Sequence, residues 1–153
     1  MLTIEEWRSR RWRVALIAHD SKKAVLTALV QRHRAEFAGW ELLATGGTGA
    51  VIRETTGLRL RLVLPGPRGG DAQLGAEIAT GEVDALLFLR DPESAQPHEP
   101  DPAPLLRLAD LYNIPVATNL ASAECLVRAL APEGRRAVPE PSGSTPFLAR
   151  SPA

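Results

Sequence analysis

Short apolar runs alternate with amphipathic stretches along most of the chain. Four runs have the length of buried strands, at residues 14–18, 42–44, 85–89 and 116–117. Residues 58–64 alternate apolar side chains with arginine, which predicts a half-exposed strand at a sheet edge. A stretch with helical periodicity follows each run. These stretches are residues 22–34, a short helix after residue 49 that ends at about residue 56, and residues 72–80, 105–112 and 122–130. Ser21 and Ser122 are the expected N-caps of the first and last helices.

This repeated strand-then-helix order predicts an α/β fold. We expect a Rossmann-like, three-layer α/β/α arrangement around a five-stranded parallel sheet. Residues 1–130 would form this domain. Residues 131–153 contain five prolines and little periodicity, so we expect an irregular C-terminal tail and not a second domain.

Composition narrows the classes of function. The formal net charge is zero, which predicts no general attraction to nucleic acid or to an anionic membrane. No apolar run is long enough for a membrane span, and residues 1–13 lack the apolar core of a signal peptide. The single cysteine, Cys125, fits a reducing compartment. We therefore expect a cytoplasmic protein. The chain also contains 16 arginines but only two lysines, Lys22 and Lys23.

Polar residues gather where the predicted strands end. Right-handed crossovers bring the carboxyl ends of parallel strands to one edge of the sheet, and ligands bind outside that edge. Four of the six aspartates lie in the loops at this edge, with two of three histidines and both lysines. The loops are residues 19–23, 45–49, 65–71, 90–101 and 118–119.

One of these loops has the character of an anion cradle. Thr45-Gly46-Gly47-Thr48-Gly49 precedes a helix, whose N-terminal amides attract phosphate. Neither the P-loop pattern nor the dinucleotide pattern is present. Lys23 could add a positive charge to the same anion. Taken singly, the loop also fits an ordinary turn and Lys23 a solvated surface residue.

The remaining loops predict acid–base chemistry. Pro65 to Asp71 places three glycines around Arg68 and ends on a carboxylate, which is either a helix N-cap or a base. Asp91 and Asp101 each precede a proline, which is typical of turns, and His98 is either a packed loop residue or an acid–base group. The histidines and the cysteine lack zinc-ligand spacing. Together these groups, with no set of metal ligands among them, favour acid–base chemistry on a small phosphorylated metabolite.

The same motifs resemble the methylglyoxal synthase family over about residues 12–130. The matching strings are Leu16-Ile17-Ala18-His19-Asp20, Ala44-Thr45-Gly46, Gly66-Pro67-Arg68-Gly69-Gly70-Asp71, Asp91-Pro92, Pro97-His98-Glu99-Pro100-Asp101 and Asn113-Ile114-Pro115-Val116-Ala117-Thr118-Asn119. The resemblance implies conversion of dihydroxyacetone phosphate to methylglyoxal and inorganic phosphate without a metal or organic cofactor. It also implies a homo-oligomer, commonly a hexamer.

The resemblance further implies roles for individual residues. Asp71 would take the C3 proton, His98 would act on the enediolate oxygens, Asp101 and Asp20 would support proton transfer, and Asp91 would order the site. His19 would contact the substrate. The phosphate would be held by Lys23, Thr45, Gly46, Thr48, Pro65 and Gly66, and Arg150 would reach the phosphate of a neighbouring subunit.

Three positions depart from the family pattern. Pro65 stands where serine is frequent, Gly47 where threonine is frequent, and Arg90 where an aromatic residue is common. The first two changes bear on phosphate affinity, since a hydroxyl is lost at each and an N–H at Pro65.

Two other functions stay open at this stage. One is a non-catalytic phosphate-effector module, because the same fold occurs as the regulatory domain of carbamoyl phosphate synthetase. The other is an isomerase or aldolase acting on the same metabolite. A Schiff-base aldolase would need a further buried lysine, which the chain lacks.

Overall fold

The chain folds around a parallel sheet of five strands in the order β3-β2-β1-β4-β5. The computed structural model describes residues 11–93 and 101–131. The strands are β1 (Arg13–Ala18), β2 (Glu41–Thr45), β3 (Arg61–Val63), β4 (Ala85–Leu89) and β5 (Val116–Ala117). The predicted three-layer α/β fold is confirmed, and β3 lies at an edge of the sheet, as the alternation with arginine indicated.

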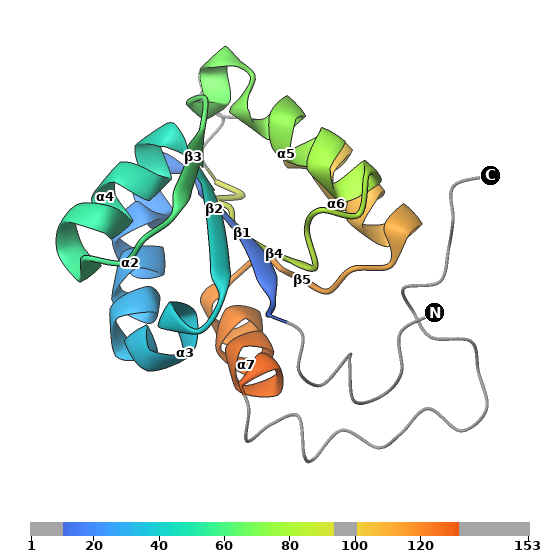
Figure 1. The fold of residues 1–153 in the computed structure, drawn as a ribbon. Coiled ribbons are helices and arrows are strands. Elements are labelled where there is room, and N and C mark those ends of the chain that lie inside the picture. Colours follow the sequence, from blue (N-terminus) through green and yellow to red (C-terminus); the bar gives the residue numbers. More distant parts are fainter. Residues whose placement is uncertain (1–10, 94–100, 132–153) are drawn as a thin grey trace, which may run out of the picture.

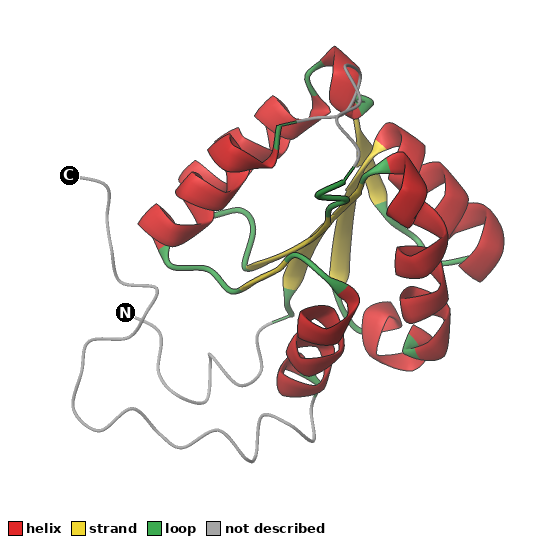
Figure 2. Ribbon diagram, turned by 180° about the vertical axis from the view of Figure 1, so that it is seen from behind, coloured by secondary structure: helices red, strands yellow, loops and turns green. Residues whose placement is uncertain are grey.

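Helices cover both faces of this sheet (Figures 1 and 2). One face carries α2 (Lys23–Arg32), α3 (Arg34–Ala38), α4 (Gly46–Thr56) and α7 (Leu120–Leu130). The other carries α5 (Gly70–Ala79) and α6 (Pro102–Tyr112). Two short 3-10 turns, η1 (Asp20–Lys22) and η2 (Gly66–Arg68), lead into α2 and α5.

Side-chain alternation along the strands divides the core into two parts. Val14 and Leu16 of β1 pack toward α2 and α7, whereas Ala15 and Ile17 pack toward α5 and α6. All four are at most 1% exposed. Because both faces are covered, the strands are continuous apolar runs, which is the usual pattern of a buried parallel sheet. Each large side chain buried in this way contributes about 1.5–3 kcal/mol to stability.

Several helices begin elsewhere than the sequence indicated. The glycine-rich stretch after β2 is the first turn of α4 and not a loop, since the helix starts at Gly46. Asp101 is the N-cap of α6, whose first residue is Pro102. Asn119, and not Ser122, caps α7 by accepting from the Ser122 amide at 2.9 Å. Ser21 caps no helix, because it lies within η1.

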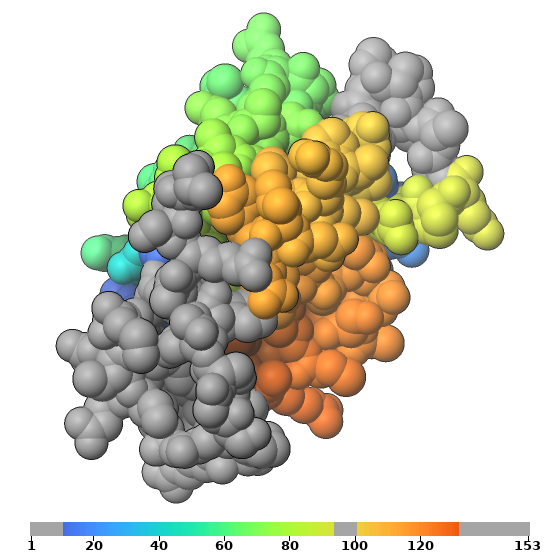
Figure 3. All heavy atoms as spheres, turned by 90° about the vertical axis from the view of Figure 1, so that its right-hand side faces the viewer, coloured from blue at the N-terminus to red at the C-terminus, as the bar shows by residue number. Residues whose placement is uncertain are grey.

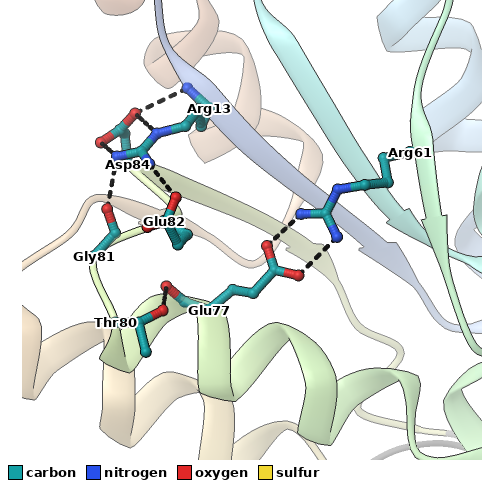
Figure 4. Close-up of polar contacts among 7 residues, drawn as sticks. All are labelled: Arg13, Arg61, Glu77, Thr80, Gly81, Glu82 and Asp84. Atoms are coloured by element: carbon teal, nitrogen blue, oxygen red, sulfur yellow. Dashed lines mark hydrogen bonds and ion pairs between the residues drawn. The ribbon is translucent and has the colours of Figure 1, made fainter.

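Buried charge is neutralised at the amino end of the sheet (Figure 4). Asp84 is only 3% exposed and accepts hydrogen bonds from the Arg13 amide at 2.9 Å and from Arg13 Nε at 3.1 Å. The same guanidinium donates to Glu82 at 2.8 Å and to the Gly81 carbonyl at 2.6 Å. These bonds fix the start of β1 against the turn that precedes β4.

Two further ion pairs join helices to their neighbours. Arg61 on β3 forms a bidentate pair with Glu77 on α5, and this hydrogen bond raises the pKa of Arg61 above its ordinary value. Arg32 and His33 at the end of α2 both contact Glu124 on α7, and these bonds lower the pKa of Glu124. The stabilisation from Glu124 is thus present at neutral pH and is lost as the pH falls through that lowered pKa.

Two observations concern the wider chain. Among residues 11–93 and 101–131, no helix combines the length and apolar character needed to cross a membrane. The expected irregular tail, apart from Ala131, lies outside the described residues.

Gly49 offers a test of how closely α4 packs on the sheet. A Cβ at this position would lie 2.1 Å from Leu62 Cδ2 and 2.8 Å from Leu60 Cδ1. Alanine gains about 1 kcal/mol in helix propensity, but overpacking costs about 1–3 kcal/mol. We expect Gly49→Ala to lower the free energy of unfolding in urea, because both leucines would have to shift and the Ala44 Cβ, at 3.0 Å, cannot move away.

Gly47→Ala is the matched control in the same helix. Its methyl would meet only the mobile end of Lys23, with Nζ at 2.8 Å. This variant should be as stable as the parent or more so. Equal effects of the two substitutions would contradict the packing argument, and Leu62→Ala should relieve part of the cost of Gly49→Ala.

Candidate active site

The loops after β1 and β4 meet where the strand order reverses direction. In open α/β sheets this switch point forms a crevice at the carboxyl ends of the strands. The Asp91 amide donates to His19 Nδ1 at 2.9 Å, and Ser21 Oγ donates to Asp91 Oδ2 at 2.7 Å. The sequence prediction that His19 and Asp91 share one edge of the sheet is therefore correct. Ser21, which the sequence predicts only as a helix N-cap, belongs to the same hydrogen-bonded group through its contact with Asp91.

His19 is held firmly in this position. The residue is 6% exposed, and its amide donates to the Leu89 carbonyl at 3.0 Å. Its ring packs edge-on against Phe88, with the ring centroids 5.4 Å apart. Asp91 is ordered locally as well, because its Oδ1 accepts from the Glu93 amide at 2.9 Å.

Lys23 lies beside the first turn of α4. Its Nζ pairs with Asp20 Oδ1 at 2.5 Å and would lie 2.8 Å from a Cβ on Gly47. The ammonium group thus sits against the N-terminal end of a helix, where the helix dipole favours an anion. Threonine at position 47 could not occupy this space unless Lys23 moved.

Thr45 and Thr48 connect β1, β2 and α4. Thr48 Oγ1 accepts from the Ala18 amide at 3.2 Å and donates to the Ala18 carbonyl at 3.4 Å. Thr45 Oγ1 donates to Thr48 Oγ1 at 3.3 Å. Both residues are at most 4% exposed. The Thr48 hydroxyl is therefore engaged with the backbone of β1, and its contribution here is to hold α4 against the end of that strand.

The loop after β3 closes against the start of α4. The Gly46 amide donates to the Leu64 carbonyl at 3.4 Å, and a Cβ on Gly46 would lie 3.2 Å from the Pro65 ring. Gly69 has a φ of 101°, which favours glycine. A Cβ on Gly70 would lie 1.8 Å from the Leu64 carbonyl oxygen, so only glycine fits there.

The two aspartates at helix starts have different local roles. The N-cap of α5 is Gly69, so Asp71 lies within the first turn and is not a cap. Asp71 is partly exposed at this edge. Asp101 is a cap, since its carboxylate accepts from the Ala103 amide at 3.0 Å.

The structure brings together most, but not all, of the predicted residues. Those that the structure describes lie at the carboxyl edge of the sheet, either at the end of a strand or in the segment that follows it. They are His19, Asp20, Lys23, Thr45, Gly46, Thr48, Pro65, Gly66, Asp71, Asp91 and Asp101. His98 and Arg150 lie outside the described residues. In Figure 3 the segment after β4, in yellow-green, projects at the same end of the molecule as the start of α6, in yellow-orange.

Within the described part of the chain, no group of three or more histidine, cysteine, aspartate or glutamate residues is placed to hold a metal ion. The carboxylates are instead spread along the ends of β1, β3 and β4 and the start of α6.

Comparison with known proteins links this geometry to one family. The MGS-like domain family matches residues 26–118. A methylglyoxal synthase of Carboxydothermus hydrogenoformans is 56% identical over 118 residues, covering 77% of this chain and 98% of the relative. One from Ralstonia nicotianae is 51% identical over 121 residues, covering 79% and 90%.

A solved structure agrees in fold as well as in sequence. The crystal structure of methylglyoxal synthase from Elizabethkingia anophelis NUHP1 superposes with a TM-score of 0.75 at 41% identity, covering 76% of this chain and 77% of that one. The family match, the identities and the shared fold agree, and the chain belongs to the methylglyoxal synthase family.

Proposed function

We propose that this protein is a methylglyoxal synthase, a lyase that converts dihydroxyacetone phosphate to methylglyoxal and inorganic phosphate. The observation that carries the proposal is the position of Lys23 against Gly47 of α4, at the same sheet edge as Asp71. An anion site beside a carboxylate suits a phosphorylated substrate that must lose a proton. Family membership supports the same reaction.

The phosphate half of the site consists of Lys23 and the start of α4. The ammonium group supplies a full positive charge, and the amides of the first helical turn supply donors. We assign Thr45, Gly46, Pro65 and Gly66 to the same phosphate, and Thr48 anchors the helix to β1. We assign Arg150 to the phosphate of a neighbouring subunit, as the family resemblance implies, in a homo-oligomer that we expect to be a hexamer.

The acid–base half begins with Asp71. Its carboxylate takes a proton from C3, and the electron pair forms the C2=C3 bond of an enediolate. The O3 hydroxyl then loses its proton and C3=O forms, while the C2=C3 electron pair shifts to C1=C2. The C1–O bond breaks in the same step, its electron pair leaves with phosphate, and the enol of methylglyoxal remains to tautomerise. His98 acts on the enediolate oxygens and His19 contacts the substrate. Asp101 and Asp20 support proton transfer, and Asp91 orders the site.

The reaction requires the C1–O bond to stand out of the enediolate plane. Phosphate is then expelled, whereas an isomerase would keep this bond in the plane. A non-catalytic phosphate module would bind phosphate without any turnover. Trapping the dicarbonyl product from purified protein and dihydroxyacetone phosphate separates these three functions.

Catalysis should need no metal ion. Protein treated with a chelator should release methylglyoxal and phosphate at the rate of untreated protein, because carboxylate and imidazole groups carry the proposed proton transfers. Both products should be measured, with the chelator removed by desalting in a parallel sample. Loss of turnover that a divalent ion restores would overturn this part of the mechanism.

Asp71→Asn should abolish the base without disturbing the fold. Turnover should fall by at least about a hundredfold, the lower range for a general base. The melting temperature should change little, since Gly69 and not Asp71 caps α5. Exchange of the C3 hydrogen of the substrate with deuterium oxide should fall in parallel.

Asp110→Asn is the matched control for that variant. Asp110 is an exposed aspartate near the end of α6, away from the site edge. Its substitution should alter neither turnover nor exchange. An Asp71→Asn protein with normal exchange would show that another group removes the proton.

Pro65→Ser should strengthen phosphate binding. The change supplies an N–H and a hydroxyl beside Gly46, whose Cβ position adjoins the Pro65 ring at 3.2 Å. A hydrogen bond to a charged group contributes about 1.5–3 kcal/mol at best. Calorimetric titration with inorganic phosphate should give tighter binding, with little change in the chemical step. Pro67→Ser in the same loop is the control, and equal effects would mean that Pro65 does not face the anion.

A further inference from the structure

Ser21, Asp91 and His19 form a continuous chain of hydrogen bonds between the ends of β1 and β4. Ser21 Oγ donates to Asp91 Oδ2 at 2.7 Å, and the Asp91 amide donates to His19 Nδ1 at 2.9 Å. The first residue is exposed, whereas the last is only 6% exposed. A surface hydroxyl is thereby connected to a buried imidazole through a single residue.

The direction of the second bond determines the state of the imidazole. A backbone amide can donate but cannot accept, so Nδ1 must present its lone pair. The proton of the neutral ring is then on Nε2, because the hydrogen bond at one ring nitrogen sets the tautomer of the other. An Nε2–H group is a donor suited to a carbonyl, enolate or phosphate oxygen. The opposite tautomer would present a lone pair to that oxygen and repel it.

The position of the Asp91 amide depends on how its loop is held. The Asp91 carboxylate accepts from Ser21 on one oxygen and from the Glu93 amide on the other, at 2.9 Å. The Glu93 bond is local and shapes the loop only within itself. The Ser21 bond crosses from η1 after β1 to the loop after β4, so it adds to the His19–Leu89 backbone bond in fixing where the loop lies relative to His19.

We propose that Ser21 is a positioning residue that acts through Asp91 to hold His19 as the Nε2–H tautomer, ready to donate a hydrogen bond to a substrate oxygen. The identity of that oxygen rests on the proposed function. The tautomer itself does not, since the contacts that set it lie within the chain.

The tautomer can be measured directly by nitrogen NMR. Protein labelled with ¹⁵N-histidine gives separate shifts for protonated and unprotonated ring nitrogens, and a His19→Gln spectrum identifies the signals of His19. We expect an unprotonated Nδ1 and a protonated Nε2 in the neutral ring. Ser21→Ala should lower the fraction of this tautomer, and Ser21→Thr, which keeps the hydroxyl, should restore it.

Kinetics supply the second measurement. Ser21→Ala should lower kcat about tenfold, as expected when one hydrogen bond that acts in the transition state is lost. KM for dihydroxyacetone phosphate should change less. Ser122→Ala is the matched control, because Ser122 is an exposed serine that bonds to Asn119 through its backbone amide. Melting temperatures of the Ser21 and Ser122 variants should stay close to that of the parent, since both serines are exposed.

A double-mutant cycle tests the route through Asp91. If Ser21 acts through that carboxylate, Ser21→Ala should have no further effect on the tautomer in an Asp91→Ala background. An equal effect in both backgrounds would overturn the proposal, as would an unchanged tautomer in Ser21→Ala. Absence of methylglyoxal from the parent protein would contradict the proposed function alone, because the tautomer measurement needs no turnover.

Discussion

The register between β1 and β4 is the constraint on which the rest of the structure depends. Five residue pairs join these central strands, from Val14 with Ala85 to Ala18 with Leu89. At the amino end the register is fixed by Arg13, which neutralises the buried Asp84 carboxylate. Removing one partner of such a buried pair generally costs about 3–5 kcal/mol. A slip of one residue would exchange the two faces of β1 and separate the loops that form the site.

The site combines two functions in one short segment after β1. Asp20 and Lys23 form an ion pair beside the start of α4, whereas His19 and Ser21 bond to the loop after β4. The 3-10 turn makes this division possible, because it interrupts the helical register before α2 begins at Lys23. In the proposed mechanism, binding and proton transfer therefore rest on the same backbone segment, residues 19–23, so a change in one should be felt in the other.

Much of the fold could be predicted because apolar runs and parallel topology leave few alternatives. The sheet edge that carries the polar loops followed directly from them. The helix starts could not be placed so well. Consecutive glycines have low helix propensity, yet α4 begins at Gly46 because tertiary packing overrides propensity. Asp101-Pro102 is typical of a turn, but the same pair also suits an N-cap followed by proline at the first helical position, which is what the structure has. The partnership of Ser21 with Asp91 joins residues 70 positions apart, and one sequence gives no sign of it.

The scarcity of lysine has a practical consequence for anyone labelling this protein. Lys22 and Lys23 are its only lysines, and both lie at the start of α2 beside the site. Amine-reactive dyes, cross-linkers and coupling resins, which scatter over most protein surfaces, would here attach beside the phosphate half of the site or at the terminal amine. Cys125 is exposed on α7 and provides a thiol handle on a different element. Maleimide chemistry at that residue is the better route to an immobilised or fluorescent protein that still binds its ligand.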